Sequence, residues 1–319
     1  MSAYDIAVII VTYNSEDEIS ACLDAVYSER RDVSMQVIVV DNASADSTVE
    51  IVRERYPAVN LLLPGGNLGF AKGVNYGSRQ ADADFVLLLN PDTVVRRHAI
   101  DVIVGFAREN PRYGLYGGRT LKTDGSLEPL SCLGLPTLCS TLMFATGLSS
   151  LAPGSPLLNP ESLGGWKRDT VREVGVITGC FLLVGAAIWQ KLGGLDESYF
   201  MYGEDVDFAI RARALGYRPV ICPDAELVHK LGTSSESPAH KMLLLYRSKA
   251  SLMRKHWRGW RLKTGLFLLA AGTGLRALPS ILSRPLHPDG NRWRTVWRHR
   301  REWLCGYGRP IVDQTPANS

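Results

Sequence analysis

Four short apolar runs in the first 90 residues, each followed by a polar turn, most constrain the fold of this 319-residue chain. Runs that are apolar throughout and rich in β-branched residues are typical of strands buried on both faces of a sheet. Helical patterns separate them, and strands that alternate with helices predict βαβ units and a parallel sheet. We expect strands at residues 6–11, 37–40, 60–63 and 85–89, and helices at 15–27, 47–55 and 71–80.

The pattern loosens after residue 117. Residues 122–172 are rich in Gly, Pro, Ser and Leu and favour no regular element, and long segments of this kind are often functional. Ser15, with Glu18 three residues later, predicts a capping box at the start of the first helix. Later in the chain we expect strands at 181–184 and 218–222, a helix at 204–215, and mostly helix over 239–282.

Charge is distributed unevenly along the chain. Residues 1–238 contain 20 Lys and Arg against 29 Asp and Glu, whereas residues 239–319 contain 16 against 3. An acidic body with a basic extension predicts chemistry in the first part and contact with an anionic surface in the second. Six cysteines without a CxxC pair indicate neither a zinc site nor a disulfide framework, so a reducing compartment is expected. The N-terminus lacks a signal-peptide pattern, and the apolar stretch 265–275 is too short to span a bilayer.

Polar clusters follow the predicted strands at four places: Thr12-Tyr13-Asn14, Asp41-Asn42, Asn90-Pro91-Asp92, and the segment 202–207, YGEDVD. A polar residue after a strand is usually a turn former, and Asp41 could simply cap its own turn. Four clusters at one end of one sheet indicate a ligand site instead, because open parallel sheets bind ligands at that edge. The chain has no P-loop and no GxGxxG after the first strand, so neither familiar nucleotide motif explains the site.

The chain resembles the family 2 glycosyltransferases over roughly residues 5–232. The resemblance is carried by His229 and by VIIVTYNSEDEISACLDAV, VIVVDNASADST, NLGFAKGVNYG, LLLNPDT, TGCFLLV and GGLDESYFMYGEDVDFAIRARALGY. The pattern is most similar to the bacterial dTDP-rhamnosyltransferase branch. It implies an α/β, GT-A fold with a mostly parallel central sheet flanked by helices. We expect a catalytic domain at 1–238, with a nucleotide-binding half at about 1–120 and an acceptor half at about 121–238, followed by a basic amphipathic helical extension at 239–319.

The resemblance places a nucleotide-sugar donor at the sheet edge and on the Gly-rich loop. Asp41 is expected to accept hydrogen bonds from the nucleobase, which would explain a carboxylate at the end of a buried strand. Glycines let the backbone approach a ligand, and a helix N-terminus favours phosphate, although these glycines could also serve only a turn. The expected donor-binding residues are Thr12, Asn14, Asp41, Asn67, Gly69, Phe70, Asn75, Asn90 and Asp92.

A divalent metal, Mg²⁺ or Mn²⁺, is the expected cofactor. Asn90-Pro91-Asp92 stands where the family has Asp-x-Asp, with Asn in place of the first acid, which puts the metal affinity in question. Hard cations prefer carboxylate and phosphate oxygens, so Asp92 is the expected ligand. His229 is the second expected ligand because imidazole suits Mn²⁺, with a purely structural histidine as the alternative. The metal would neutralise charge on the leaving diphosphate.

Three acids lie at the start of the predicted helix 204–215, more than helix capping requires. By resemblance, Asp205 is the catalytic base that takes the proton of the acceptor hydroxyl, and one base with one displacement inverts the anomeric carbon. Glu204 is expected to bind the acceptor or to orient Asp205. By resemblance, Thr178-Gly179-Cys180 lines the sugar side of the pocket, and Arg211 and Arg213 are expected to pair with nearby acids.

The extension combines basic residues, tryptophans and an apolar helical face formed by Leu262, Leu266, Leu269, Ala270 and Thr273. This combination favours a helix on an anionic membrane surface, with packing or oligomer contact as the alternative and nucleic acid not expected as a partner. The predicted protein is therefore cytoplasmic and peripheral on the inner face of the bacterial plasma membrane. Its predicted activity is inverting transfer of L-rhamnose from dTDP-L-rhamnose to a lipid-linked or polysaccharide acceptor in cell-surface glycan synthesis.

Three alternatives stay open at the level of the sequence. A UDP donor could supply a different sugar through the same mechanism. The missing first acid at Asn90 also leaves room for a non-catalytic subunit that only binds a sugar nucleotide, although the intact Asp92, Glu204, Asp205 and His229 argue against it. A nucleic-acid-binding protein with an α/β body would predict salt-sensitive binding through the basic extension.

Overall fold

The computed structural model describes residues 2–29, 31–230, 237–282 and 292–308. Two parts of the expected extension, residues 283–291 and 309–319, lie outside the described residues. The chain folds as two compact units. The first comprises Met1–Pro136, Ala152–Phe200 and Glu204–Ser235, and the second comprises Thr137–Leu151, Met201–Gly203 and Glu236–Ser319.

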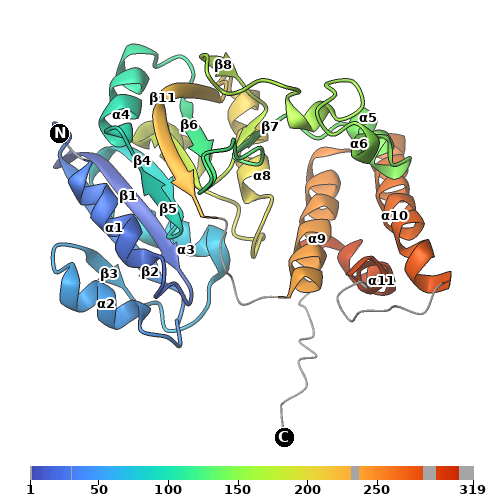
Figure 1. The fold of residues 1–319 in the computed structure, drawn as a ribbon, viewed down its shortest axis with the longest axis horizontal. Coiled ribbons are helices and arrows are strands. Elements are labelled where there is room, and N and C mark those ends of the chain that lie inside the picture. Colours follow the sequence, from blue (N-terminus) through green and yellow to red (C-terminus); the bar gives the residue numbers. More distant parts are fainter. Residues whose placement is uncertain (1, 30, 231–236, 283–291, 309–319) are drawn as a thin grey trace, which may run out of the picture. The chain divides into compact units, whose positions relative to one another are not determined.

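A nine-stranded sheet forms the centre of the first unit (Figure 1). Its strand order is β3-β2-β1-β4-β10-β6-β11-β5, and β8 pairs with β11. A separate pair of short strands, β7 and β9, forms a second sheet. The strands are β1 (Tyr4–Thr12), β2 (Met35–Asp41), β3 (Asn60–Leu62), β4 (Ala83–Leu89), β5 (Thr93–Val95), β6 (Leu115–Leu121), β7 (Cys132–Leu133), β8 (Arg172–Glu173), β9 (Val176–Ile177), β10 (Phe181–Gly185) and β11 (Val220–His229).

The first four strands confirm the predicted βαβ pattern. Strands β3, β2, β1 and β4 are neighbours and run parallel, and each contains most of a predicted apolar run. The helices between them are α1 (Ile19–Ser28), α2 (Thr48–Arg55) and α3 (Gly69–Ser78). The predicted capping box is wrong, because α1 begins four residues after Ser15. Its N-cap is Glu18, and the Ser15 carbonyl accepts from the Ile19 N–H.

Two strands differ from the prediction in ways that shape the site. Strand β10 runs antiparallel to both of its neighbours, β4 and β6, so it begins at the edge where β4 ends. Strand β11 is parallel to β6 and runs well past the predicted stop at Cys222, to His229. A register shift between Cys222 and Glu226 interrupts its pairing, which explains why the sequence pattern suggested an earlier end.

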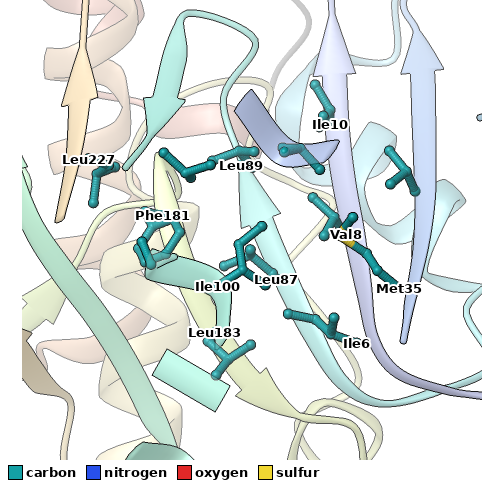
Figure 2. Packing of buried hydrophobic residues seen from close by; sticks show 14 of the residues in the cluster. Ile6, Val8, Ile10, Met35, Leu87, Leu89, Ile100, Phe181, Leu183 and Leu227 are labelled. Atoms are coloured by element: carbon teal, nitrogen blue, oxygen red, sulfur yellow. The ribbon is translucent and has the colours of Figure 1, made fainter. Parts of the chain in front are cut away.

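Buried apolar side chains pack on both faces of the sheet. One face carries α1 and α4 (Ala99–Glu109), and its core includes Ile6, Val8 and Ile10 from β1. Figure 2 shows these side chains with Leu87 and Leu89 of β4 and Ile100 of α4. The other face carries α3, α7 (Ala186–Leu192) and α8 (Glu204–Ala214). Covering both faces leaves the strand ends as the place where polar side chains can meet a ligand.

The second unit is helical and joins a mid-chain segment to the C-terminal part. Its elements are α5 (Leu138–Ala145), α6 (Leu148–Leu151), α9 (Pro238–His256), α10 (Gly259–Leu282), α11 (Arg292–Arg298), α12 (Arg300–Trp303) and the 3-10 turn η3 (Gly306–Gly308). Tyr246 lies at its centre, with ring centroids of Phe144, Trp293 and Trp303 at 5.9, 6.0 and 5.5 Å. The predicted helix over 239–282 is interrupted at Trp257-Arg258.

The apolar face predicted for α10 packs inside this unit. Leu269 and Thr273 are buried, and Leu262, Leu266 and Ala270 contact the cluster around Tyr246. A different face of α10 is exposed and apolar; it presents Trp260, Phe267, Leu275 and Leu278. No helix among the described residues is both long enough and apolar enough to cross a bilayer.

Candidate active site

The ends of several strands bring polar groups together at one edge of the central sheet. Strand β4 ends next to Asn90, whose N–H donates to the carbonyl of Cys180 at 3.2 Å, just before β10. Strand β5 pairs antiparallel with the end of β11, so Thr93 lies opposite His229. The topology therefore gathers residues that are 90 and 137 positions apart in the sequence, as the Asn90–Cys180 and Asp92–His229 contacts show.

Asp92 and His229 form a direct pair at this edge. The Nε2 atom of His229 lies 3.0 Å from Oδ1 of Asp92, and both side chains are 14% exposed. The Lys230 N–H donates to the Asp92 carbonyl at 2.9 Å, which fixes the loop. A carboxylate beside an imidazole is a donor set that fits Mn²⁺. Within the described residues no three His, Cys, Asp or Glu side chains are grouped closely enough to hold a metal, so this pair alone would need further oxygen ligands.

Cys180 lies among the carboxylates of the site. Burial raises the pKa of its thiol to about 12, and the negative charges of Asp92, Asp205 and Glu128 add to the shift. The thiol therefore stays protonated at neutral pH, which argues against a cysteine nucleophile. The charges of all three carboxylates therefore affect the same thiol.

Glu204 and Asp205 begin helix α8 in different environments. Glu204 is buried at 5% exposure, and within the described part of the chain its Oε2 atom has no hydrogen-bond partner. Burial raises the pKa of Glu204 well above its ordinary value, and the charge of Asp205 raises it further. Asp205 is half-buried, and its Oδ1 accepts the Val206 N–H at 2.7 Å. The two neighbouring carboxyls therefore have different surroundings, and burial favours the protonated form of Glu204.

The third acid of this helix is structural. Asp207 is buried, and its Oδ2 accepts from Nε of Arg211 at 2.7 Å. Arg211 also donates to the carbonyls of Leu192 and Gly194, so it ties α8 to the preceding loop. This confirms the predicted ion pair of Arg211. Arg213 instead donates to the Val174 carbonyl at 3.3 Å, and within the described part of the chain no ion pair involves it.

The predicted nucleobase side is assembled from the ends of β1 and β2. The Thr12 hydroxyl donates to Oδ2 of Asp41 at 2.9 Å, and the Ser44 N–H donates to Oδ1 at 2.9 Å. Asn14 accepts the Ala45 N–H at 2.8 Å through its side chain. Asp41 thus holds its own turn, as the simpler interpretation predicted. The Ser44 hydroxyl donates a third bond to Asp41, at 2.5 Å, and a contact of this buried carboxylate with a base stays a prediction.

The Gly-rich loop is shaped by Phe200. Asn67 accepts the Gly69 N–H at 2.9 Å, and the Phe70 N–H donates to the Phe200 carbonyl at 2.8 Å. Gly69 has φ +75°, and a Cβ at this position would lie 2.3 Å from the Phe200 oxygen. Phe70 in turn lies against Gly179, where a Cβ would be 2.8 Å from its ring. Phe70 therefore faces the Thr178–Cys180 segment, whereas Asn67 is exposed at the loop.

The side chain of Asn75 binds a distant part of the protein, whereas a contact with the donor was expected. Its Nδ2 donates to the Leu195 carbonyl at 2.8 Å and to Oε1 of Glu197 at 3.1 Å, and its Oδ1 accepts the Leu195 N–H at 3.0 Å. Both amide hydrogens are used inside the protein. Gly194 leaves room for this contact, because a Cβ there would lie 2.5 Å from Oδ1 of Asn75. We therefore do not include Asn75 among the donor-binding residues.

Glu128 is a buried acid that no motif in the sequence singles out. It lies in the segment that returns along the end of β6, where its N–H donates to the Thr120 carbonyl at 3.0 Å. The side chain is 2% exposed, although it follows a Gly- and Ser-rich turn. No periodicity marks it in the sequence. A lone acid among the apolar and small residues of 125–135 was the one available signal.

Comparison with known proteins identifies the family. The model described as "Glycosyl transferase family 2" matches residues 7–133. An N-acetylglucosaminyl-diphospho-decaprenol L-rhamnosyltransferase of Mycobacterium tuberculosis is 32% identical over 268 residues, which covers 79% of this chain and 85% of that protein. The chain belongs to glycosyltransferase family 2. This glycosyltransferase is also 27% identical to rhamnosyltransferase WbbL of Escherichia coli K12 over 231 residues, covering 70% of the chain and 82% of WbbL.

Solved structures show that the fold is that of GT-A glycosyltransferases. The mannosyltransferase PcManGT of Pyrobaculum calidifontis, in complex with GDP-Man and Mn²⁺, matches with a TM-score of 0.55 and 17% identity. The match covers 95% of this chain and 86% of the PcManGT chain. Residues 1–349 of S. aureus TarS, in complex with UDP-GlcNAc, match with a TM-score of 0.51 and 18% identity, over 97% of this chain and 95% of the TarS chain. The predicted fold class is confirmed.

Proposed function

We propose that this glycosyltransferase moves L-rhamnose from dTDP-L-rhamnose to a lipid-linked or polysaccharide acceptor in bacterial cell-surface glycan synthesis. The choice of sugar rests on the two relatives named as rhamnosyltransferases, one of which is 32% identical. The reaction type rests on one observation above all. Helix α8 begins with two adjacent carboxyls, the buried Glu204 and the half-buried Asp205.

Asp205 is the base in this proposal. Its partly exposed carboxylate would take the proton of the acceptor hydroxyl as that oxygen attacks the anomeric carbon. Glu204 holds its proton because of burial and can donate a hydrogen bond to the acceptor or to Asp205. A single displacement at the anomeric carbon inverts its configuration.

Asp92 and His229 would hold a divalent metal, Mg²⁺ or Mn²⁺, together with the donor diphosphate. Such a metal supplies positive charge that stabilises the leaving nucleoside diphosphate. Because the described residues offer only this pair, the diphosphate and water would complete the coordination. The proposed neighbours of the donor are Thr12, Asn14, Asp41, Asn67, Gly69, Phe70 and Asn90.

We also propose that residues 1–238 act as the catalytic domain and that the extension 239–319 rests on the inner face of the plasma membrane. The exposed face of α10 carries Trp260 and Phe267, at 72% and 70% exposure, and the basic Arg258, Arg261 and Lys263 lie at the same end of the helix. Apolar side chains next to basic ones fit an anionic lipid surface by charge complementarity.

Vesicle sedimentation tests this membrane proposal. Phosphatidylglycerol vesicles should retain the protein more strongly than phosphatidylcholine vesicles. The double change Trp260→Ser and Phe267→Ser should abolish the retention, whereas Leu157→Ser, at a residue 81% exposed in the first unit, should not. Equal retention of all three proteins would contradict the proposal.

Nucleoside diphosphate release tests the proposed reaction. The donors are dTDP-L-rhamnose, UDP-glucose, UDP-galactose and UDP-GlcNAc, each with Mn²⁺, with Mg²⁺ or with EDTA, and with a polyprenyl-diphosphate-linked GlcNAc as acceptor. We expect acceptor-dependent, metal-dependent release from dTDP-L-rhamnose. Release only from a UDP-sugar would keep the mechanism and overturn the rhamnosyl assignment. Binding of donors without any release would favour the non-catalytic alternative.

A further inference from the structure

Glu128 is a buried acid at the proposed site that the mechanism above does not use. Glu128 is 2% exposed; its Oε1 accepts the Leu130 N–H at 2.9 Å, while its buried Oε2 has no hydrogen-bond partner among the residues that the structure describes. Leaving a buried polar atom without a hydrogen bond is costly, and more so for a charged group. The free oxygen is therefore an acceptor position that a ligand hydroxyl could fill.

Hydrogen bonds connect Glu128 to the catalytic edge of the sheet. The Ser131 hydroxyl donates to the Glu128 carbonyl at 3.1 Å. The Ser131 carbonyl accepts both the N–H and the hydroxyl of Thr178, at 3.0 and 3.1 Å. Thr178 lies 3.2 Å from the Cys180 sulfur through its hydroxyl, and the Cys180 carbonyl accepts from Asn90. These bonds tie the segment that carries Glu128 to the edge that holds Asp92.

The segment that carries Glu128 is held rigidly. Arg168 is buried at 2% exposure and donates to the carbonyls of Pro129 and Cys132, at 3.0 and 3.4 Å. It also donates to the Cys132 sulfur at 3.4 Å. A side chain fixed by its neighbours in this way can recognise one ligand geometry, because little ordering is needed on binding.

We propose that Glu128 binds a hydroxyl group of the donor sugar and so helps to select that sugar. A carboxylate accepts hydrogen bonds and cannot donate them when ionised, so it recognises hydroxyls. It repels phosphate, so its partner is the sugar and not the diphosphate at Asp92. This proposal rests on the proposed function in taking a nucleotide sugar as the donor, but it does not depend on which sugar is transferred.

Equilibrium binding tests the role of Glu128 without requiring turnover. Isothermal titration in Mn²⁺ would compare each donor of the release panel with its own nucleoside diphosphate, for the wild type, Glu128→Gln and the exposed Glu173→Gln. A hydrogen bond to a charged group contributes about 1.5–3 kcal/mol, or roughly 10- to 100-fold in affinity. We expect Glu128→Gln to weaken binding of the nucleotide sugar about 10-fold or more and leave the nucleoside diphosphate unchanged. Glu173→Gln should change neither.

Deoxy analogues of the bound donor sharpen the test. One monodeoxy analogue should bind the wild type more weakly than the parent sugar, and Glu128→Gln should bind that analogue and the parent about equally. If a UDP-sugar binds instead of dTDP-L-rhamnose, the rhamnosyl assignment fails while the same loss is still expected. Equal affinity of Glu128→Gln for all nucleotide sugars, or a parallel loss for nucleoside diphosphates, overturns the proposal. So does a wild type that binds no nucleotide sugar more tightly than its nucleoside diphosphate.

Discussion

Replacing Asn75 by Ala separates a structural asparagine from a ligand-binding one. The change removes three hydrogen bonds, at 2.8, 3.0 and 3.1 Å, and leaves the N–H and carbonyl of the buried Leu195 without their partner. Each unsatisfied buried group costs about 1–3 kcal/mol, while the bond to the exposed Glu197 adds little. We expect a loss of about 3 kcal/mol in the free energy of unfolding.

Thermal and urea unfolding measure this loss, and titration with dTDP measures ligand binding. For a unit of this size, about 3 kcal/mol lowers Tm by about 6–12 °C. Ser78→Ala is the matched control, because it removes one bond to the Asn75 carbonyl within the same helix and should cost about 1 kcal/mol or less. The affinity of folded Asn75→Ala for dTDP should match the wild type. An unchanged Tm with a tenfold weaker affinity would refute the structural role.

Two further changes test the Gly-rich loop at Gly69 and the raised pKa of Glu204. Gly69→Ala places a Cβ 2.3 Å from the Phe200 oxygen at φ +75°, so it should destabilise the protein by about 2 kcal/mol or more. Gly66→Ala is the control, because a Cβ there has nothing within 4 Å, and it should not destabilise the protein. Equal Tm values for the two variants would contradict this expectation. Glu204 has a raised pKa in the folded state, so the folded protein keeps a proton that the unfolded chain releases above the ordinary value of 4.5. Wild-type stability should therefore fall as pH rises from 4.5 through the folded pKa, while Glu204→Gln lacks this fall. Urea unfolding at about pH 5 and pH 8 should show the variant gaining relative to the wild type, and parallel curves would argue against a buried, protonated Glu204.

Local pattern was enough to predict the first half of the sheet. The apolar runs ending at Thr12, Asp41 and Asn90 gave parallel strands because burial on both faces leaves an unmistakable pattern. The antiparallel direction of β10 could not be predicted, because a short apolar strand reads the same in either direction. The continuation of β11 to His229 was hidden by the irregular residues after Cys222.

Site residues were predictable where a motif marks a strand end. Asp92 and His229 were each expected as metal ligands; the structure places them 3.0 Å apart, and the metal role stays a prediction. Asn75 shows the opposite case, since an asparagine in a Gly-rich helix could bind either a ligand or a distant loop, and the contact with Leu195 spans 120 residues. Glu128 was marked in the sequence only as a lone acid among apolar and small residues, because its burial arises from tertiary packing.

In the proposed reaction, Asp205 acts as the base of the glycosyl transfer. The most direct test is the rate of nucleoside diphosphate release by Asp205→Asn, with the exposed Asp124→Asn as matched control, on the donor that the wild type uses. A general base typically contributes 10²–10⁴-fold, so we expect a loss of that order with unchanged affinity for the donor. An Asp205→Asn protein that keeps most of the wild-type rate would contradict the account.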